Sequence, residues 1–466
     1  MNKDLTTGNV TKTMLIFAGP MIAGNLLQQF YNIADTLIVG KFLGAEAMAA
    51  VGTAYTLMSF LTSILIGLCM GSGSVFSFYY GKKDILKMQD CIRAAFFMIG
   101  GITIVVNVLS FLLTDQILRL LRIPKELMAM MRLYVLIIFA GIFFVFLYNY
   151  FSYFLRALGN SVIPLYFLGG TSLLNVALDL LFVLGFGWGI GGAAAATVIS
   201  QAISGVGIGI YAWVKEPWLR DALTPGKWKK RLLAENNSHV STKESIKEIA
   251  RFSFAASIQQ SVMNFGILVV QGLVNSFGVA VMAAFTAAVK IDSFAYMPAQ
   301  EFGNAFSLFV SQNFGAGKED RVKKGVKHAL GISMIFCLFI SVVVFGFAKY
   351  LMLLFVSPSE TEIINIGVGY LRVEGAFYCG IGILFLLYAF YRGINRPEMS
   401  LILTVISLGT RVLLAYVLSP VPAIGVMGIW WAIPIGWFLA DMTGIIYMAV
   451  RVRKTVFAPV VTPPDR

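Results

Sequence analysis

Long apolar blocks are the feature that most limits what this chain can fold into. A helix needs roughly 20 apolar residues to cross a bilayer. The 466 residues are 58% hydrophobic and only 13% charged, whereas soluble domains carry about 25% charged residues. The sequence therefore predicts an all-α polytopic membrane protein with twelve transmembrane helices. We place these at about 14–39, 47–79, 91–113, 131–155, 162–185, 190–214, 252–275, 279–314, 328–348, 364–391, 399–419 and 424–450.

Three of these blocks, at 47–79, 279–314 and 364–391, are long enough to tilt, bend or extend beyond the bilayer. Proline marks further candidate bends, at Pro20 in the first block and Pro298 in the eighth. Such breaks are tolerated in membrane helices.

The positive charges lie mainly on one side of the predicted membrane. With the N-terminus placed inside, 27 of the 36 lysines and arginines fall in the cytoplasmic tails and loops. This bias sets orientation, so we expect both termini in the cytoplasm and the protein in the plasma or inner membrane. The net charge of +13 thus reports topology and does not indicate a nucleic-acid partner.

Residue types that carry enzymatic chemistry are scattered. His239 and His328 lie in charged loops, and the spacing of the four cysteines suggests neither a disulfide framework nor a metal site. The sequence shows no HExxH motif and no GxSxG motif in a suitable context. We therefore expect a protein that is not an enzyme and that needs no cofactor.

The two halves of the chain repeat each other. Segment 155–165 aligns without gaps to 391–401, and 189–192 aligns to 425–428, both at an offset of 236 residues. Because each half has six crossings, the two halves share one orientation, as in carriers built from parallel repeats. Three further pairs occur in the same order, namely 26–30 with 257–261, 47–60 with 281–294, and 78–84 with 313–320.

The repeat predicts two pseudo-symmetric six-helix bundles. We expect an N-terminal lobe at 1–214, a cytoplasmic linker at 215–250 and a C-terminal lobe at 251–466. The end of the linker, "STKESIKEIARF", has the pattern of an amphipathic helix that leads into the seventh block.

Two carboxylates lie inside apolar blocks of the N-terminal half. Asp35 and Asp179 are a similar number of residues from the outer ends of the first and fifth blocks, so they reach a similar depth. Asn175 is one turn before Asp179 on the same helix face. Thr197 reaches this depth from the sixth block, and the Ala193 carbonyl lies in the same turn. No lysine or arginine lies in these three blocks.

These groups offer an all-oxygen cage with two carboxylates. Such a cage suits Na⁺, or a shared proton if the carboxylates approach closely. For Na⁺, the side-chain ligands would be Asp35, Asn175, Asp179 and Thr197. The alternative is a buried polar network with a purely structural role, which holds the first, fifth and sixth helices together.

Three segments carry a resemblance to a known family, the multidrug and toxic compound extrusion (MATE) transporters. They are "GNLLQQFYNIADTLIVG", "LRALGNSVIPL" and "NVALDLLFVLGFGWGIGGAAAATVISQ". The resemblance covers essentially the whole chain and is strongest to the DinF-like branch. It implies a V-shaped, two-lobed exporter of bulky, often cationic or amphipathic compounds. It also implies a cation-coupling role for Asp35, Asn175, Asp179, Ala193 and Thr197.

The C-terminal half does not repeat the cage, because the offset of 236 residues maps Asn175 onto Arg411 and Asp179 onto Ala415. The seventh block also lacks the acid that the NorM branch carries there. Polar residues of the eighth block, Lys290, Asp292 and Glu301, form either a structural charge network or a substrate-contacting or gating group. Asp292 can pair with Arg411 of the eleventh block. Glu374 of the tenth block is a further candidate, which can pair with nearby Arg372.

Gln28 and Tyr31 lie on roughly the same face of the first block as Asp35. They are candidates for contact with substrate, and plain helix packing explains them equally well.

The sequence as a whole favours an H⁺- or Na⁺-coupled antiporter that works by alternating access as a monomer. One rival is a flippase for a lipid-linked oligosaccharide or another amphipathic lipid. For the lipid-linked oligosaccharide, the cavity should be basic to hold a pyrophosphate. Only Lys290 and Arg411 are intramembrane cations here, which argues against it. A channel suits the two repeated bundles less well. The sequence leaves open which compounds are exported and which ion drives export.

Overall fold

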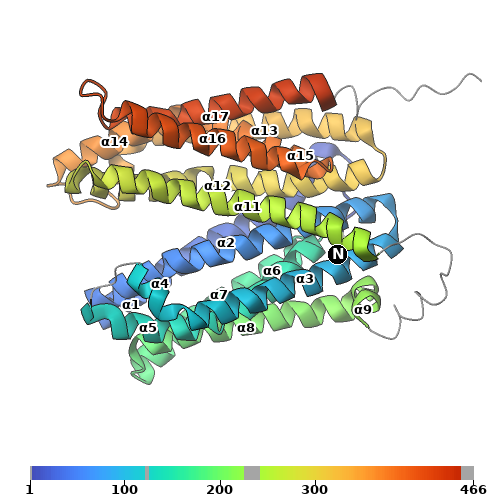
Figure 1. Cartoon of the computed structure of the whole chain (residues 1–466), viewed down its shortest axis with the longest axis horizontal. Coiled ribbons are helices and arrows are strands. Elements are labelled where there is room, and N and C mark those ends of the chain that lie inside the picture. Colours follow the sequence, from blue (N-terminus) through green and yellow to red (C-terminus); the bar gives the residue numbers. More distant parts are fainter. Residues whose placement is uncertain (1–2, 121–124, 225–241, 453–466) are drawn as a thin grey trace, which may run out of the picture. The chain divides into compact units, whose positions relative to one another are not determined.

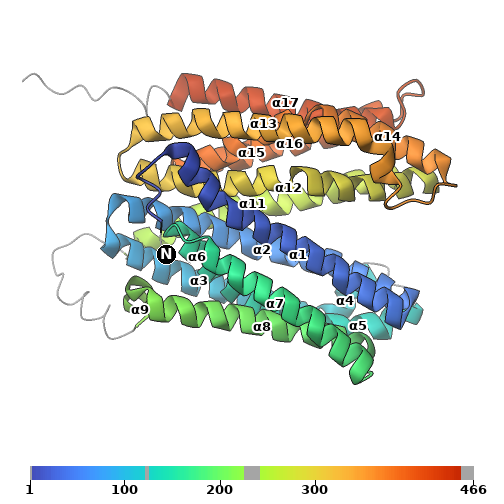
Figure 2. The same cartoon turned by 180° about the vertical axis from the view of Figure 1, so that it is seen from behind.

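The computed structural model describes residues 3–120, 125–224 and 242–452 of the chain. Every element in these residues is helical (Figures 1 and 2). The elements are α1 (Val10–Leu43), α2 (Ala45–Lys82), α3 (Ile85–Leu112), α4 (Thr114–Leu120), α5 (Lys125–Phe139), α6 (Ile142–Ala157), α7 (Val162–Leu180), η1 (Leu181–Gly185), α8 (Gly189–Lys215), α9 (Pro217–Leu223), α11 (Thr242–Asn275), α12 (Val279–Gly315), α13 (Glu319–Met352), α14 (Thr361–Ala376), α15 (Tyr378–Gly393), α16 (Pro397–Leu418), α17 (Met427–Tyr447) and η2 (Met448–Val452).

The number of crossings agrees with the sequence. Within the described ranges, 10 helices are long and apolar enough to span a membrane, and the number is 12 when each of two bent helix pairs is counted as one span. The prediction of an all-α polytopic fold is therefore confirmed.

Two predicted crossings are broken rather than straight. The pair α5 and α6 bends by 40°, and the pair α14 and α15 bends by 53°. The sequence allowed for a bend in 364–391 but not in 131–155. At both breaks the backbone tightens into a three-residue hydrogen bond, from Gly141 N to Ile138 O at 2.8 Å and from Phe377 N to Glu374 O at 3.0 Å. The breaks at 141 and 377 occupy equivalent places in the repeat.

The helices that contain proline behave differently. Pro20 lies inside α1 and Pro298 inside α12, yet both helices run without interruption. Proline removes one backbone donor and does not by itself end a membrane helix whose freed groups find other partners.

The described chain forms two compact units, Met1–Ser261 and Val262–Arg466. The boundary between them falls inside α11, a continuous helix of 34 residues. The predicted amphipathic segment is the start of this helix. Residues 225–241 of the predicted linker lie outside the described residues.

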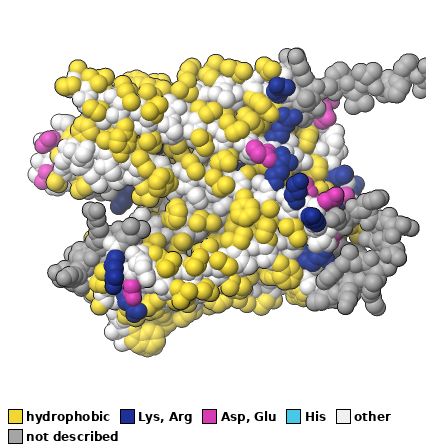
Figure 3. Space-filling view, viewed as in Figure 1, with side chains coloured by type: hydrophobic (Ala, Val, Ile, Leu, Met, Phe, Trp, Pro, Cys, Tyr) yellow, Lys and Arg dark blue, Asp and Glu magenta, His cyan; other side chains and the backbone are white. Residues whose placement is uncertain are grey.

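On the face shown in Figure 3, apolar side chains are spread along the helices, while Lys and Arg gather toward the helix ends. On α13, Ile335, Phe339 and Val342 are 73%, 65% and 71% exposed. Large apolar side chains exposed along a whole helix indicate a lipid-facing surface.

Close packing in the first unit depends on Gly205 of α8. A Cβ at this position would lie 2.5 Å from the Phe144 carbonyl oxygen of α6, whereas a Cβ on Gly101 of α3 would meet nothing within 4 Å. We expect Gly205→Ala to lower the melting temperature of the purified protein, because overpacking costs about 1–3 kcal/mol. Gly101→Ala should raise it slightly, since alanine is the better helix former. Shifts of equal sign in the two variants would contradict this account.

Candidate functional site

The two predicted carboxylates are buried in the first unit. Asp35 on α1 is 9% exposed, and Asp179 on α7 is fully buried. One oxygen of each carboxylate, Oδ1, has no hydrogen-bond partner among the described residues. Helices α1 and α7 are in contact, as are α7 and α8, and the three run side by side in Figure 2.

Asn175 connects α7 to α8 and orients Asp179. With its amide turned so that both atoms find partners, Asn175 Nδ2 donates to Asp179 Oδ2 at 3.2 Å, and its oxygen accepts from the Thr197 backbone N–H at 3.3 Å. In the other amide orientation, Nδ2 donates to Thr197 Oγ1 at 3.5 Å. Hydrogen-bond networks decide such orientations, and the first leaves no clash between like groups. Ala193 is buried one turn before Thr197.

Asp35 and Asp179 lie close enough for each carboxylate to act on the other. Ionised carboxylates only accept hydrogen bonds, so this pair holds together when one member is protonated or when a cation lies between them. No lysine or arginine in the described residues acts on either group. The structure thus brings Asp35, Asn175, Asp179 and Thr197 together, as the sequence predicted, and we call these four residues the carboxylate site.

The helix that carries Asp179 changes its winding directly after the site. Regular α-helix ends at Leu180 and gives way to a π-helical turn, η1. Widened turns of this kind are rare and occur frequently at functional sites. Sequence reasoning gave no sign of this turn.

Tyrosines from two further positions lie near the carboxylates. Tyr31, one turn before Asp35, and Tyr134 of α5 both lie within electrostatic range of Asp35 and Asp179. Tyr31 was a candidate on α1, whereas Tyr134 was missed, because nothing distinguishes it in an apolar helix. The repeat offset of 236 residues, which maps Tyr134 onto Tyr370, is the signal that would have found it. Gln28 is exposed on α1.

The second unit has its own buried acids. Asp292 of α12 is 6% exposed and Glu374 of α14 is fully buried. Both lie within electrostatic range of Arg411 of α16. Tyr370 donates to Asp292 Oδ2 at 3.5 Å. This set, Asp292, Tyr370, Glu374 and Arg411, is the Arg411 cluster.

The Arg411 cluster corrects one prediction and supports another. Arg372 lies over the Phe345 ring, with 5.6 Å to the ring centroid. The cation within electrostatic range of Glu374 is Arg411, not its neighbour in sequence. The expected proximity of Asp292 and Arg411 is present. Because two acids offset its charge, Arg411 does not make a basic pocket of the kind that a pyrophosphate needs.

The other charges predicted on the eighth block lie apart from this cluster. Lys290 is exposed. Glu301 accepts from Asn304 Nδ2 at 3.2 Å, and Asn304 in turn accepts from Arg392 at 3.2 Å. Of Lys290, Asp292 and Glu301, only Asp292 joins the Arg411 cluster.

Comparison with known proteins gives a consistent result. The profile of the family described as MatE matches residues 20–181 and 255–417, which is more than half of the chain. The probable multidrug resistance protein YpnP of Bacillus subtilis (strain 168) is 32% identical over 405 residues, covering 87% of this chain and 87% of that protein. The probable multidrug resistance protein NorM of Thermotoga maritima is 25% identical and covers 90% of this chain and 88% of its own.

Solved structures share the fold. The Vibrio cholerae MATE transporter VcmN in its bent form superimposes with a TM-score of 0.84 at 22% identity. The match covers 96% of this chain and 97% of that one.

Proposed function

Because the chain belongs to the MatE family, we propose that it exports bulky cationic or amphipathic compounds in exchange for H⁺ or Na⁺. The curated relatives named above are described as multidrug resistance proteins. We place the carrier in the cell membrane as a monomer with both termini in the cytoplasm. The one-sided distribution of lysine and arginine supports this orientation.

One observation carries the coupling proposal, namely the close approach of two buried carboxylates, Asp35 and Asp179. Two buried carboxylates in one site cannot both stay ionised without a counter-charge. Since the described residues supply no fixed cation there, the counter-charge comes from solution. The site therefore binds an ion that can also leave, which is the property that a coupled carrier needs.

Both ions fit the groups present. A proton is shared between the two carboxylates, and Na⁺ is bound by the oxygens of Asp35, Asn175, Asp179 and Thr197, joined by the Ala193 carbonyl. All of these are hard oxygen donors of the kind that alkali cations prefer. The similarity of the N-terminal segments to the DinF-like branch supports the same assignment of residues.

The ion acts on export through the shape of α1. Neutralising Asp35 removes the cost of burying its charge and changes how α1 packs on α7. In α1, Pro20 and the adjacent Gly19 provide a weak point at which this continuous helix can bend. We propose that ion binding bends α1 there and closes the N-terminal lobe around a smaller volume, which expels the exported compound outward.

Transport in proteoliposomes tests this function. The purified protein is reconstituted, and efflux of a fluorescent cationic dye is followed under an imposed proton gradient, an imposed sodium gradient, or neither. We expect one gradient to accelerate dye movement and the other to leave it unchanged, which names the ion. Dye movement that ignores both gradients contradicts ion coupling, and the absence of any dye movement in all three conditions contradicts the export of such compounds.

A further inference from the structure

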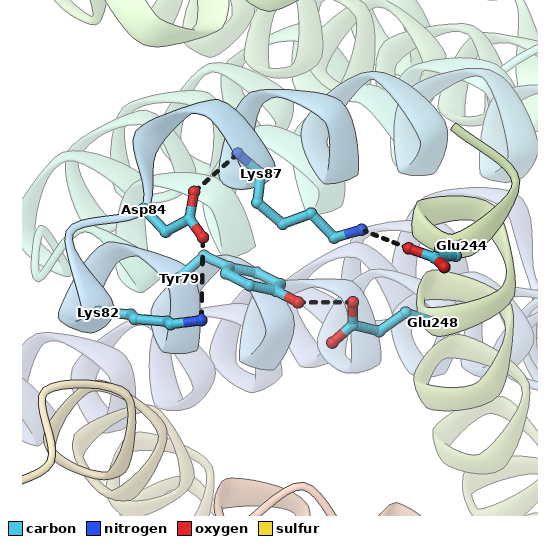
Figure 4. A network of polar contacts seen from close by, with 6 residues as sticks. All are labelled: Tyr79, Lys82, Asp84, Lys87, Glu244 and Glu248. Atoms are coloured by element: carbon cyan, nitrogen blue, oxygen red, sulfur yellow. Dashed lines mark hydrogen bonds and ion pairs between the residues drawn. The ribbon is translucent and has the colours of Figure 1, made fainter. Parts of the chain in front are cut away.

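The first half of α11, residues 242–261, packs on α2 and α3 inside the first unit. At one end of this contact, Tyr79 donates a hydrogen bond of 2.8 Å to Glu248 Oε2, and Lys87 lies 4.0 Å from Glu244 Oε2. Figure 4 shows both glutamates reaching from α11 toward the turn between α2 and α3. On the proposed orientation, this is the cytoplasmic end.

Further along, α2 and α11 touch through their backbones. A Cβ added to Gly67 would lie 2.7 Å from Ser257 N, and one added to Gly71 would lie 2.7 Å from Ser253 Cα. Ser257 also donates to the Ile64 carbonyl at 3.1 Å. Small residues four apart on each of two helices allow this approach in a membrane. From residue 64 to residue 79 the contact runs for about 22 Å, and helices in backbone contact leave no room for a solute between them.

The α2–α11 contact is closely packed, but some of the polar groups buried in it lack good hydrogen-bond partners. The Ser253 hydroxyl is fully buried and has no hydrogen-bond partner among the described residues. Ser245 is fully buried beside the Cys91 thiol, which is a weak partner. Burying an unpaired hydroxyl is unfavourable, and an exposed ion pair such as that of Glu244 contributes little. If α11 separated from α2 and α3, water would form hydrogen bonds to these hydroxyl groups. This gain lowers the free-energy cost of opening the contact.

Helix α11 connects the α2–α11 contact to the second unit. Because α11 runs unbroken across the boundary at Ser261, any displacement of its second half must lift its first half from α2 or bend the helix. Resting on the proposed function, we propose that the α2–α11 contact is the cytoplasmic gate of the carrier. It is closed when the contact is made, and it opens when α11 separates from α2 and α3.

A single substitution provides a reversible lock for this gate. S245C places a second thiol beside the native Cys91, so that oxidation can join α11 to α3. We expect the oxidised protein to lose dye transport while it still binds dye, and a reducing agent to restore transport. The matched control is S245C combined with C91A, which oxidation should not affect. The cross-link is verified by mass spectrometry of the joined peptides. If the cross-linked protein transports dye as fast as the same protein after treatment with the reducing agent, transport does not require the contact to open and the inference fails.

Cys91 also reports opening without a cross-link, because it is fully buried under α11 in the closed contact. We expect G71A to raise its alkylation rate by roughly tenfold, equivalent to about 1.4 kcal/mol. G52A, on the same helix where a Cβ meets nothing within 4 Å, should match the wild type. Equal protection of Cys91 in all three proteins would overturn the inference. This readout does not depend on export, so the gate and the transport function can fail separately.

Discussion

Export of a cationic dye by Asp35→Asn should fall to the background of empty liposomes, under either ion gradient. The asparagine amide can donate permanently to Asp179, and so it imitates the protonated pair. A site locked in that form no longer exchanges its ion, and the driving gradient has nothing to act on. The same loss is expected for Asp179→Asn, because the two carboxylates act as one pair.

These variants should retain the thermal stability of the wild type. Removing a buried charge relieves a desolvation cost, so the melting temperature of Asp35→Asn should stay at or above that of the wild type. Asp115→Asn is the matched control, because Asp115 pairs with Arg132 at the surface, where both side chains are about half exposed. If folded Asp35→Asn transports at the rate of Asp115→Asn, the carboxylate site is structural and the coupling role is wrong.

Arg411→Leu should destabilise the protein, because Arg411 lies within electrostatic range of two buried acids. Removing one partner of a buried charge pair costs up to about 3–5 kcal/mol. Glu374 is fully buried and Asp292 nearly so, and both would lose their counter-charge. The measurement is the melting temperature of the purified protein in detergent. The loss should shrink as the pH falls, since protonated acids need no cation.

A second substitution makes this prediction specific. Adding Glu374→Gln to Arg411→Leu should recover part of the lost stability, because one buried charge is removed. Arg372→Leu is the control, since Arg372 is exposed and lies over Phe345. A loss no greater in Arg411→Leu than in Arg372→Leu would show that Arg411 does not balance the two acids.

Features set by distance along one helix could be read from the sequence. Asn175 and Asp179 share a face because they are four residues apart, and the fixed rise per residue places Asp35 at their depth. Block lengths predicted the crossings for the same reason, and segment order revealed the repeat. These rules set the depth of Asp35, Asn175, Asp179 and Thr197, and the packing of α1, α7 and α8 brings the four residues together.

Features set by how helices pack were decided only by the tertiary structure. Tyr134 approaches the carboxylates from α5, Glu374 lies within electrostatic range of Arg411 and not of Arg372, and the start of α11 lies on α2. Such contacts depend on side-chain volume and backbone approach across helices, which leave no periodic trace in a single sequence. The sequence therefore determined which polar groups enter the membrane and at what depth, while only the packed helices decided which of those groups meet.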